Sequence, residues 1–212
     1  MSASALPPPH KGALRLAFLR SGTPTDIAGG IRGNKTFLRA PSPADYGPWA
    51  ELRFQSRRFL APWEPVWPSD ELTRLGFRRR IRRYQREIRD GTGYPFFIFL
   101  ADEQTIVGGL TLSHVQRGVT QSAALGYWMG ERFARKGLMT DAVRTITSYA
   151  FDTLRLHRIE AACLPHNSAS IGLLEKAGFS REGYARSFLC IDGRWQDHLL
   201  YAIVAGEHRS VT

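Results

Sequence analysis

The stretch from Ala123 to Ala150 constrains the fold of this chain more than any other part of the sequence. Residues 125–129 are apolar and aromatic and are followed by a glycine, a pattern that predicts a β-strand. Glycines on both sides of residues 127–129 indicate a bulge or the close approach of another backbone. Residues 139–154 place apolar side chains at helical spacing. The stretch is therefore predicted to be a strand, a tight basic turn and a helix.

The basic turn, residues 132–137, suggests chemistry as well as structure. Gly137 is predicted to open the helix, with Thr140 in its first turn and the cations Arg135 and Lys136 directly before it. The first four N–H groups of a helix have no internal acceptor, and the helix dipole is positive at that end. Such a place can hold an anion such as a pyrophosphate. A basic surface turn without a ligand is the alternative, and this stretch alone leaves both open.

Composition narrows the class of protein. The chain has 212 residues, of which 43% are hydrophobic, and this is enough for one domain with a real core. It has no apolar run of about 18 residues, and its N-terminus lacks the apolar region of a signal peptide. Cys163 and Cys190 lie in apolar runs and are expected to be buried free thiols in a reducing cytoplasm. No cysteine–histidine cluster has zinc spacing, so no metal site is expected.

The net charge of +10 comes mostly from arginine. A net positive charge of this size favours the binding of anions such as nucleic acid or nucleotide cofactors, although a high net charge also increases solubility. Residues 70–90 are predicted to form a long helix with a partial apolar stripe, and arginine covers the rest of its surface. The arginines are Arg74, Arg78, Arg79, Arg80, Arg82, Arg83, Arg86 and Arg89. This helix is either a solvated face or a patch for phosphates or an acidic partner.

Apolar periodicity and the glycine and proline breaks predict the element order β-α-α-β-β-β-α-β-α-β-β. This order corresponds to an α/β fold with a mixed, mostly antiparallel central sheet flanked by helices. Short connections predict three successive antiparallel strands at 96–100, 105–115 and 125–129.

Local signals fix several boundaries. Asn167 is predicted to cap a helix that stops at Gly178, and Asp192-Gly193 predicts a hairpin. The whole chain divides into a partly irregular extension with a short edge strand at 14–19, a domain and a tail, at residues 1–33, 34–206 and 207–212.

Several local motifs resemble those of the Gcn5-related N-acetyltransferase (GNAT) superfamily, whose element order matches residues 35–205. They are Leu-Gly-Tyr-Trp-Met at 125–129, Arg-Lys-Gly-Leu-Met-Thr at 135–140, Pro-His-Asn-Ser-Ala-Ser at 165–170, Leu-Leu-Glu-Lys-Ala-Gly-Phe at 173–179 and Asp-Gly-Arg-Trp-Gln-Asp-His at 192–198. The last three, with Phe-Leu-Ala-Pro-Trp-Glu-Pro at 59–65, resemble the RimJ/RimL branch of ribosomal-protein-alanine N-acetyltransferases.

The resemblance implies acetyl-CoA as the donor co-substrate. It implies that the backbone around Tyr127, Trp128 and Met129 pairs with the pantetheine arm, and that Asn167 hydrogen-bonds the pantetheine amides. The phosphate turn of the family would fall on Arg135, Lys136, Gly137, Leu138, Met139 and Thr140. The chain departs from the family pattern at Ala134, where the family has glutamine or arginine, and at Met139, where it has glycine or alanine. Backbone N–H groups make most contacts there, so the site is expected to survive.

The catalytic residues are less clear from the resemblance. Many members carry a tyrosine seven residues after the asparagine, as the acid that protonates the leaving thiolate, and here that position is Leu174. Ser170 lies one turn earlier on the same helix face and is the candidate for a hydroxyl near the sulfur, with a surface role as the alternative. Glu64, Asp197 and Glu160 are candidates for the base, each with a structural role as the alternative.

The sequence therefore predicts an acetyl-CoA-dependent N-acetyltransferase that acts on a protein N-terminus, such as that of a ribosomal protein, by direct attack in a ternary complex. A weak RNA contact through the arginine-rich helix fits this environment. The same chemistry on a small amine or antibiotic is one alternative, and a non-catalytic ribosome- or RNA-associated module is another. The acceptor, the base and the oligomeric state stay open.

Overall fold

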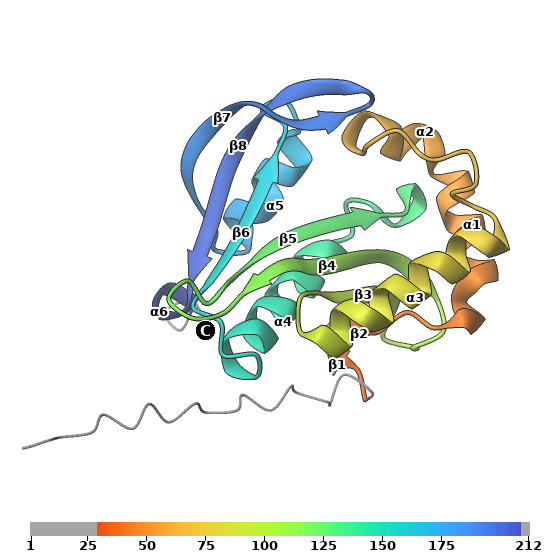
Figure 1. Ribbon diagram of the computed structural model, residues 1–212, viewed down its shortest axis with the longest axis horizontal. Helices are drawn as coiled ribbons and strands as arrows, with labels where there is room; N and C mark the ends of the chain where they lie inside the picture. Colours follow the sequence, from red (N-terminus) through yellow and green to blue (C-terminus); the bar gives the residue numbers. More distant parts are fainter. Residues whose placement is uncertain (1–28, 209–212) are drawn as a thin grey trace, which may run out of the picture.

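The computed structural model describes residues 29–208, and an eight-stranded sheet forms their centre (Figure 1). The strand order is β1-β2-β3-β4-β5-β6-β8-β7, and every neighbouring pair is antiparallel except β5–β6. The predicted α/β class with a mixed, mostly antiparallel sheet is confirmed. The strands are β1 (Ile31–Arg32), β2 (Thr36–Arg39), β3 (Tyr94–Leu100), β4 (Ile106–Gln116), β5 (Ser122–Met129), β6 (Arg158–Cys163), β7 (Ser180–Ile191) and β8 (Arg194–Val204).

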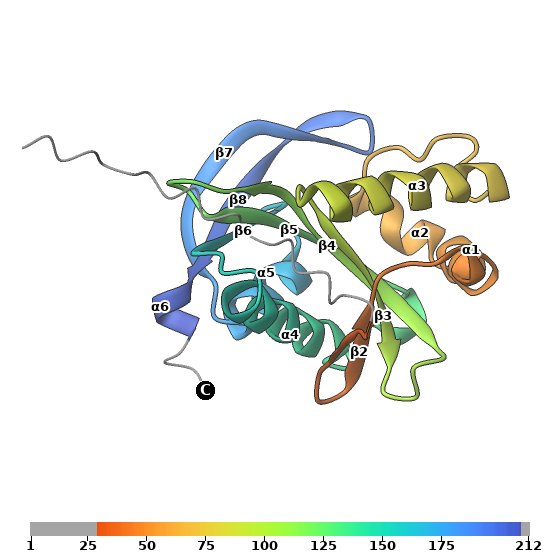
Figure 2. The ribbon, with the colours of Figure 1, turned by 60° about the horizontal axis from the view of Figure 1, so that its bottom comes forward.

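Helices cover both faces of the sheet, and Figure 2 shows α1 and α3 on one side with α4 and α5 on the other. The α-helices are α1 (Tyr46–Gln55), α2 (Arg57–Leu60), α3 (Arg74–Asp90), α4 (Leu138–Asp152), α5 (Ser168–Lys176) and α6 (Ala205–His208). The described part of the chain also has the short 3-10 turns η1 (Pro43–Asp45), η2 (Ala61–Trp63) and η3 (Glu131–Phe133). None of the helices within residues 29–208 is long and apolar enough to cross a membrane.

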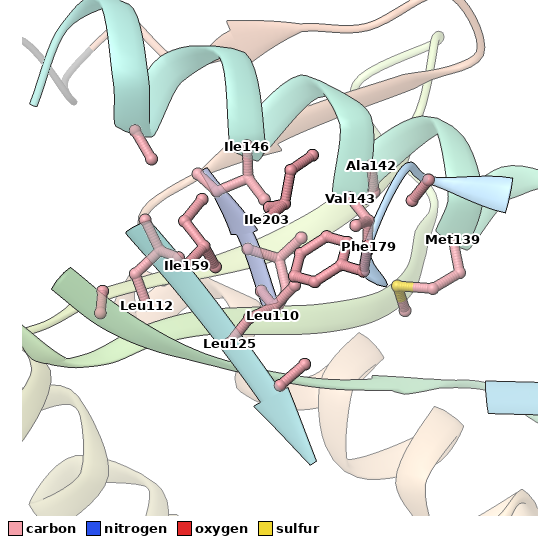
Figure 3. Packing of buried hydrophobic residues seen from close by; sticks show 14 of the residues in the cluster. Leu110, Leu112, Leu125, Met139, Ala142, Val143, Ile146, Ile159, Phe179 and Ile203 are labelled. Carbon is pink, nitrogen blue, oxygen red and sulfur yellow. The ribbon is translucent and has the colours of Figure 1, made fainter. Parts of the chain in front are cut away.

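The larger core lies between the sheet and α4. The apolar stripe predicted for this helix is buried, and Val143 and Ile146 are fully inaccessible (Figure 3). They pack with side chains from β4, β5, β6 and β8, among them Leu110, Leu125, Ile159 and Ile203. A second core lies on the other face, where Trp49 of α1 and Phe77 and Ile81 of α3 pack on β3. Burial of apolar area on both faces is what holds the sheet in place.

Most predicted boundaries are close to the observed ones. The long arginine helix begins at Arg74 and not at residue 70, because residues 68–73 form turns and the Thr73 hydroxyl accepts a hydrogen bond from Gly76 N to cap it. Ile31–Arg32 form β1 at the end of the stretch that was expected to be an extension outside the domain, since they pair with Leu38 and Phe37 of β2. The strand predicted at 14–19 lies outside the described residues.

The two cysteines differ. Cys163 is a buried free thiol, as predicted, but Cys190 is exposed, and the prediction for it was wrong. The reason is that β7 is the outermost strand of the sheet and leaves much of its surface to solvent. An apolar run in the sequence does not reveal which strand will be at an edge.

Candidate functional site

The parallel strands β5 and β6 part in the middle of the sheet. They pair only at Ser122↔Arg158, Ala123↔Ile159 and Ala124↔Glu160. Beyond this point residues 125–129 of β5 stay paired with β4, and the end of β6 stays paired with β8 (Figure 1). Within the described chain, no strand covers the open side of β5. Its free backbone groups are therefore available to an extended ligand that carries amides.

Close packing on the other side of β5 explains the glycine pair of β4. A side chain at Gly108 would meet the Trp128 carbonyl oxygen, and a Cβ at Gly109 would lie 2.6 Å from the Trp128 indole nitrogen. The close approach is thus at this pair, whereas Gly126, one of the two glycines at which it was expected, has only open space around it. Glycine at both β4 positions leaves room for the Trp128 carbonyl beside Gly108 and for the Trp128 ring over Gly109.

The turn between β5 and α4 leaves N–H groups uncapped. Gly137 is the N-cap, with φ of 74°, and Arg135 also has a positive φ of 61°. The first helical hydrogen bond runs from Asp141 N to Gly137 O at 3.1 Å, so the N–H groups of residues 138–140 have no intrahelical acceptor. No side chain of residues 29–208 caps them. Leu138 and Met139 bury their side chains in the core, so they offer only backbone to a ligand.

A lysine from the far end of the sheet joins this turn. The Lys35 ammonium nitrogen lies 3.7 Å from the position that a Cβ on Gly137 would take. Asp141 of α4 holds the β1–β2 turn in place, because its carboxylate accepts hydrogen bonds from Asn34 N (3.1 Å), Lys35 N (2.9 Å) and Thr36 Oγ1 (2.7 Å). Sequence reasoning missed Lys35, since nothing local connects it to residues about a hundred positions later.

Cations also line the groove beside this turn. Its volume is ≈ 1290 Å³, and its basic lining residues are Arg32, Lys35, Arg135, Arg144 and Lys176. The groove runs along the solvent side of α4 from Gly137 onward. Arg135 and Lys35 lie at the positive end of the α4 dipole and favour the same anionic group, whereas Arg144 and Lys176 lie farther along the groove, which Asp141 and Asp152 also line.

Hydroxyl groups meet between β5 and α5. Asn167 caps α5, as predicted, by accepting a hydrogen bond from Ser170 N at 3.0 Å. The Ser170 hydroxyl lies 2.6 Å from the Tyr127 hydroxyl, which links the helix to β5. Burial raises the pKa of Tyr127 above its ordinary value, and burial also raises the pKa of the neighbouring Cys163 thiol. Both groups therefore stay protonated at neutral pH, and Leu174 of α5 is fully buried.

Glu64 is engaged by a buried arginine. Its carboxylate accepts hydrogen bonds from Arg53 Nη1 (2.6 Å), Arg53 Nη2 (2.8 Å) and Trp67 Nε1 (2.7 Å). The Arg53 guanidinium also lies over the rings of Trp67 (4.2 Å) and Trp128 (4.9 Å). The Glu64 carbonyl accepts a hydrogen bond from Asp192 N at 3.0 Å. This residue therefore joins α1, the loop after η2 and the β7–β8 hairpin.

The other two carboxylates are engaged as well. Asp197 accepts hydrogen bonds from the Tyr184 hydroxyl and from Ser187 N (2.7 Å), and these two bonds lower the pKa of its exposed carboxyl. Glu160 forms an ion pair with Arg158 at 2.8 Å on the surface of β6. The structure thus brings Tyr127, Ser170 and Asn167 together at the opening. The carboxylates of Glu64, Asp197 and Glu160 are instead bound by other protein groups.

No three histidine, cysteine, aspartate or glutamate side chains of residues 29–208 gather in a way that could hold a metal ion. What the geometry offers is an opening in the sheet with free backbone, an uncapped helix end surrounded by cations, and a pair of hydroxyl groups between them.

Comparison with known proteins gives a consistent result. The model of the acetyltransferase (GNAT) domain matches residues 35–180. The chain is 37% identical to the probable N-acetyltransferase YjcK of Bacillus subtilis (strain 168), over 82% of this chain and 96% of that protein. It is 38% identical to the ribosomal protein uS5-alanine N-acetyltransferase of Escherichia coli (strain K12), over 73% of this chain and 79% of that protein.

Solved structures agree with the sequence relatives. Mycobacterium smegmatis RimJ in complex with CoA-disulfide superposes with a TM-score of 0.78 at 34% identity, covering 81% of this chain and 83% of that chain. The ribosomal-protein-S5-alanine acetyltransferase of Vibrio fischeri superposes with a TM-score of 0.77 at 28% identity, covering 82% of this chain and 96% of that one.

Proposed function

We propose, because the chain belongs to the GNAT acetyltransferase family, that it transfers the acetyl group of acetyl-CoA to the N-terminal amine of a protein. The observation that carries the donor half is the opening between β5 and β6, next to the uncapped start of α4. The acceptor half is supported by the similarity to the E. coli enzyme that modifies alanine of ribosomal protein uS5. A ribosomal protein with an N-terminal alanine is the acceptor class we favour.

The chain's own groups suit each part of the donor. The free backbone of residues 127–129 matches the amides of the pantetheine arm, and Asn167 lies across the opening from it. The N–H groups of residues 138–140 suit the diphosphate, with Arg135, Lys136 and Lys35 to neutralise its charge. This extends the family pattern by one residue, Lys35, and lets basic neighbours replace the missing side chain at Ala134.

The reaction needs a proton removed from one partner and delivered to the other. The neutral amine attacks the thioester carbonyl carbon, the carbon–sulfur bond breaks, and the departing sulfur takes up a proton. The Ser170 and Tyr127 hydroxyls, hydrogen-bonded to each other and protonated at neutral pH, form the chain's proton source at the opening. Ser170 gives its proton to the sulfur and regains one from Tyr127, and Tyr127 in turn regains a proton from solvent before the next turnover. Free backbone N–H groups of β5 can polarise the thioester oxygen.

Glu64 and Asp197 act, in this proposal, as supports for the acceptor loops. Each carboxylate already accepts hydrogen bonds from at least two protein donors. A low pKa also makes Asp197 a poor proton acceptor near neutral pH. The proton of the amine then leaves to water in the groove.

Replacing Glu64 with glutamine tests this assignment. The change leaves the buried Arg53 short of its closest carboxylate, and it is expected to lower the free energy of unfolding by about 3 kcal/mol while reducing kcat by less than about tenfold. Thermal melts and kcat at several pH values measure both effects. Glu160→Gln, on an exposed pair, is the control and should change neither. A loss of about a hundredfold or more in kcat at unchanged stability would make Glu64 the base.

A panel of acceptors tests the proposed function itself. Release of the CoA thiol is followed with a peptide that begins with alanine, the same peptide blocked at its N-terminus but carrying an internal lysine, a polyamine and an aminoglycoside. Only the first is expected to react. Faster reaction of the polyamine or aminoglycoside would replace the acceptor and keep the donor. If no acceptor reacts and acetyl-CoA does not stabilise the fold, the chain is a non-catalytic member of the family.

A further inference from the structure

The arginines of α3 divide into two groups by their partners. Arg79, Arg80, Arg83 and Arg89 pair with carboxylates of Asp70, Glu71, Glu87 and Asp90. The other group consists of four exposed arginines that have no carboxylate partner among residues 29–208, namely Arg74, Arg78, Arg82 and Arg86. We call these four the arginine ladder. Much of the positive charge of this helix is thus already neutralised on one side and left free on another.

The spacing of the ladder makes it a continuous surface. Its members are four residues apart, so each step rises about 6 Å along the helix and turns by only about 40°. The ladder therefore extends for about 18 Å, which corresponds to about five nucleotides of one strand in a duplex at ~3.4 Å each. A row of cations at this spacing fits a polymer with regularly spaced charges better than it fits a single small anion.

A shallow groove accompanies the ladder. Pro43, Tyr46 and Gln85 line it together with Arg74, Arg78 and Arg82, around a cavity of ≈ 290 Å³. The Arg74 guanidinium lies over the Tyr46 ring at 4.6 Å, and the Tyr46 hydroxyl donates a hydrogen bond to Leu72 O at 2.9 Å. Arginine side chains held against an aromatic ring lose less freedom when they bind, and their forked geometry suits phosphate oxygens.

The ladder is separate from the candidate acetyl-donor site. α3 lies on one face of the sheet, whereas α4, whose N-terminus would receive the diphosphate, lies on the opposite face (Figure 2). A molecule on the ladder would not compete with the donor. None of the four arginines serves the chemistry proposed above.

We propose that Arg74, Arg78, Arg82 and Arg86 bind the phosphate backbone of a nucleic acid, independently of its base sequence. Binding of this kind releases counterions, so its affinity falls steeply with salt, with a slope of about −0.9 in log K against log salt for each phosphate contact on a duplex. Four contacts on the ladder thus contribute about −3.6 to the slope.

Two double variants of the full chain test the proposal by fluorescence anisotropy with a labelled RNA duplex and a labelled DNA duplex. R78Q/R82Q removes two ladder arginines, and R79Q/R83Q removes two paired arginines from the same helix. Both remove the same net charge. We expect R78Q/R82Q to make the salt slope shallower by about 1.8 and R79Q/R83Q to change it by less than half as much.

Equal changes in the two variants would show that only net charge matters, and they would overturn the proposal. Tighter binding of poly-L-glutamate than of either duplex, lost in R78Q/R82Q, would assign the ladder to an acidic protein and overturn it as well. A slope that is the same for RNA and DNA supports backbone recognition as stated. The acetyl-CoA-induced rise in melting temperature and the acetylation of a short peptide should be unchanged in R78Q/R82Q. If the wild-type protein shows neither the acetyl-CoA-induced rise in melting temperature nor acetylation of the peptide, that result counts against the proposed function and not against the arginine ladder.

Discussion

Replacing Gly137 with valine is expected to abolish the rise in melting temperature that acetyl-CoA gives the wild-type protein. Gly137 has φ of 74°, a conformation that costs a residue with a side chain about 1–2 kcal/mol. The added side chain would also project toward the Lys35 ammonium, into the space before the free N–H groups of α4. Relief of this strain would change the backbone angles at residue 137 and reorient the N–H groups of residues 138–140, which the diphosphate needs.

The size of the wild-type effect can be bounded. A ligand that binds only the folded state at a hundred times its Kd stabilises it by about 2.7 kcal/mol, and in a chain of this length that raises Tm by roughly 5–10 °C. Differential scanning fluorimetry with and without acetyl-CoA measures it. In Gly137→Val the shift should be close to zero at the same concentration.

Gly118 supplies the matched control for this experiment. It has φ of 71°, nothing lies within 4 Å of the Cβ it lacks, and it sits in the turn between β4 and β5. Gly118→Val should therefore lower Tm by a similar amount through strain and keep the full acetyl-CoA shift. A Gly137→Val protein with the full shift would remove this turn from the donor site.

Replacing Ser170 with alanine is expected to lower kcat by about a hundredfold or more, while the KM for acetyl-CoA changes much less. A positioned acid contributes typically about 10²–10⁴-fold to the rate. Ser170 is the hydroxyl that joins α5 to Tyr127, and its backbone N–H already serves the Asn167 cap. Tyr127→Phe should lower kcat in the same direction but less, because Ser170 can still reach the sulfur.

The pH profile gives a second measure of the hydroxyl pair. Burial raises the pKa of Tyr127 above its ordinary value near 10, so the hydroxyl keeps its proton as the pH rises. Tyr127 should therefore cause no loss of kcat on the alkaline side up to about pH 10.

Ser168→Ala, on the exposed first turn of α5, is the control for Ser170→Ala and should behave as wild type. A Ser170→Ala protein that turns over at the wild-type rate would reject Ser170 as the acid.

Local chemistry was readable from the sequence wherever neighbours in the chain decide the structure. Asn167 caps α5, and Gly178, with φ of 93°, follows the end of this helix. Asp192-Gly193 turn the β7–β8 hairpin, and Gly137 opens α4. In each case one or two residues satisfy the backbone within a few positions, so the signal is short-ranged.

Contacts between distant elements could not be predicted from the sequence, because no short-range signal connects the residues that form them. Lys35 reaches Gly137 only because Asp141 binds the β1–β2 turn, and Tyr127 meets Ser170 only once α5 packs beside β5. Glu64 looked like a free carboxylate in an aromatic loop until Arg53 of α1 came to lie against it. Hydrophobic periodicity sets which face is buried, but it does not say which side chain of another element will be opposite.

The short seam between β5 and β6 has a mechanical consequence. β5 and β6 share three residue pairs, so their backbone hydrogen bonds do not fix the distance between the two strands beyond those pairs. Packing in the core sets that distance, because Val143 and Ile146 of α4 lie in the same buried cluster as Leu125 of β5 and Ile159 of β6 (Figure 3). Removing one methyl group from Val143 or Ile146 should therefore weaken the binding of a ligand held between β5 and β6, although these side chains lie in the core and not at the opening.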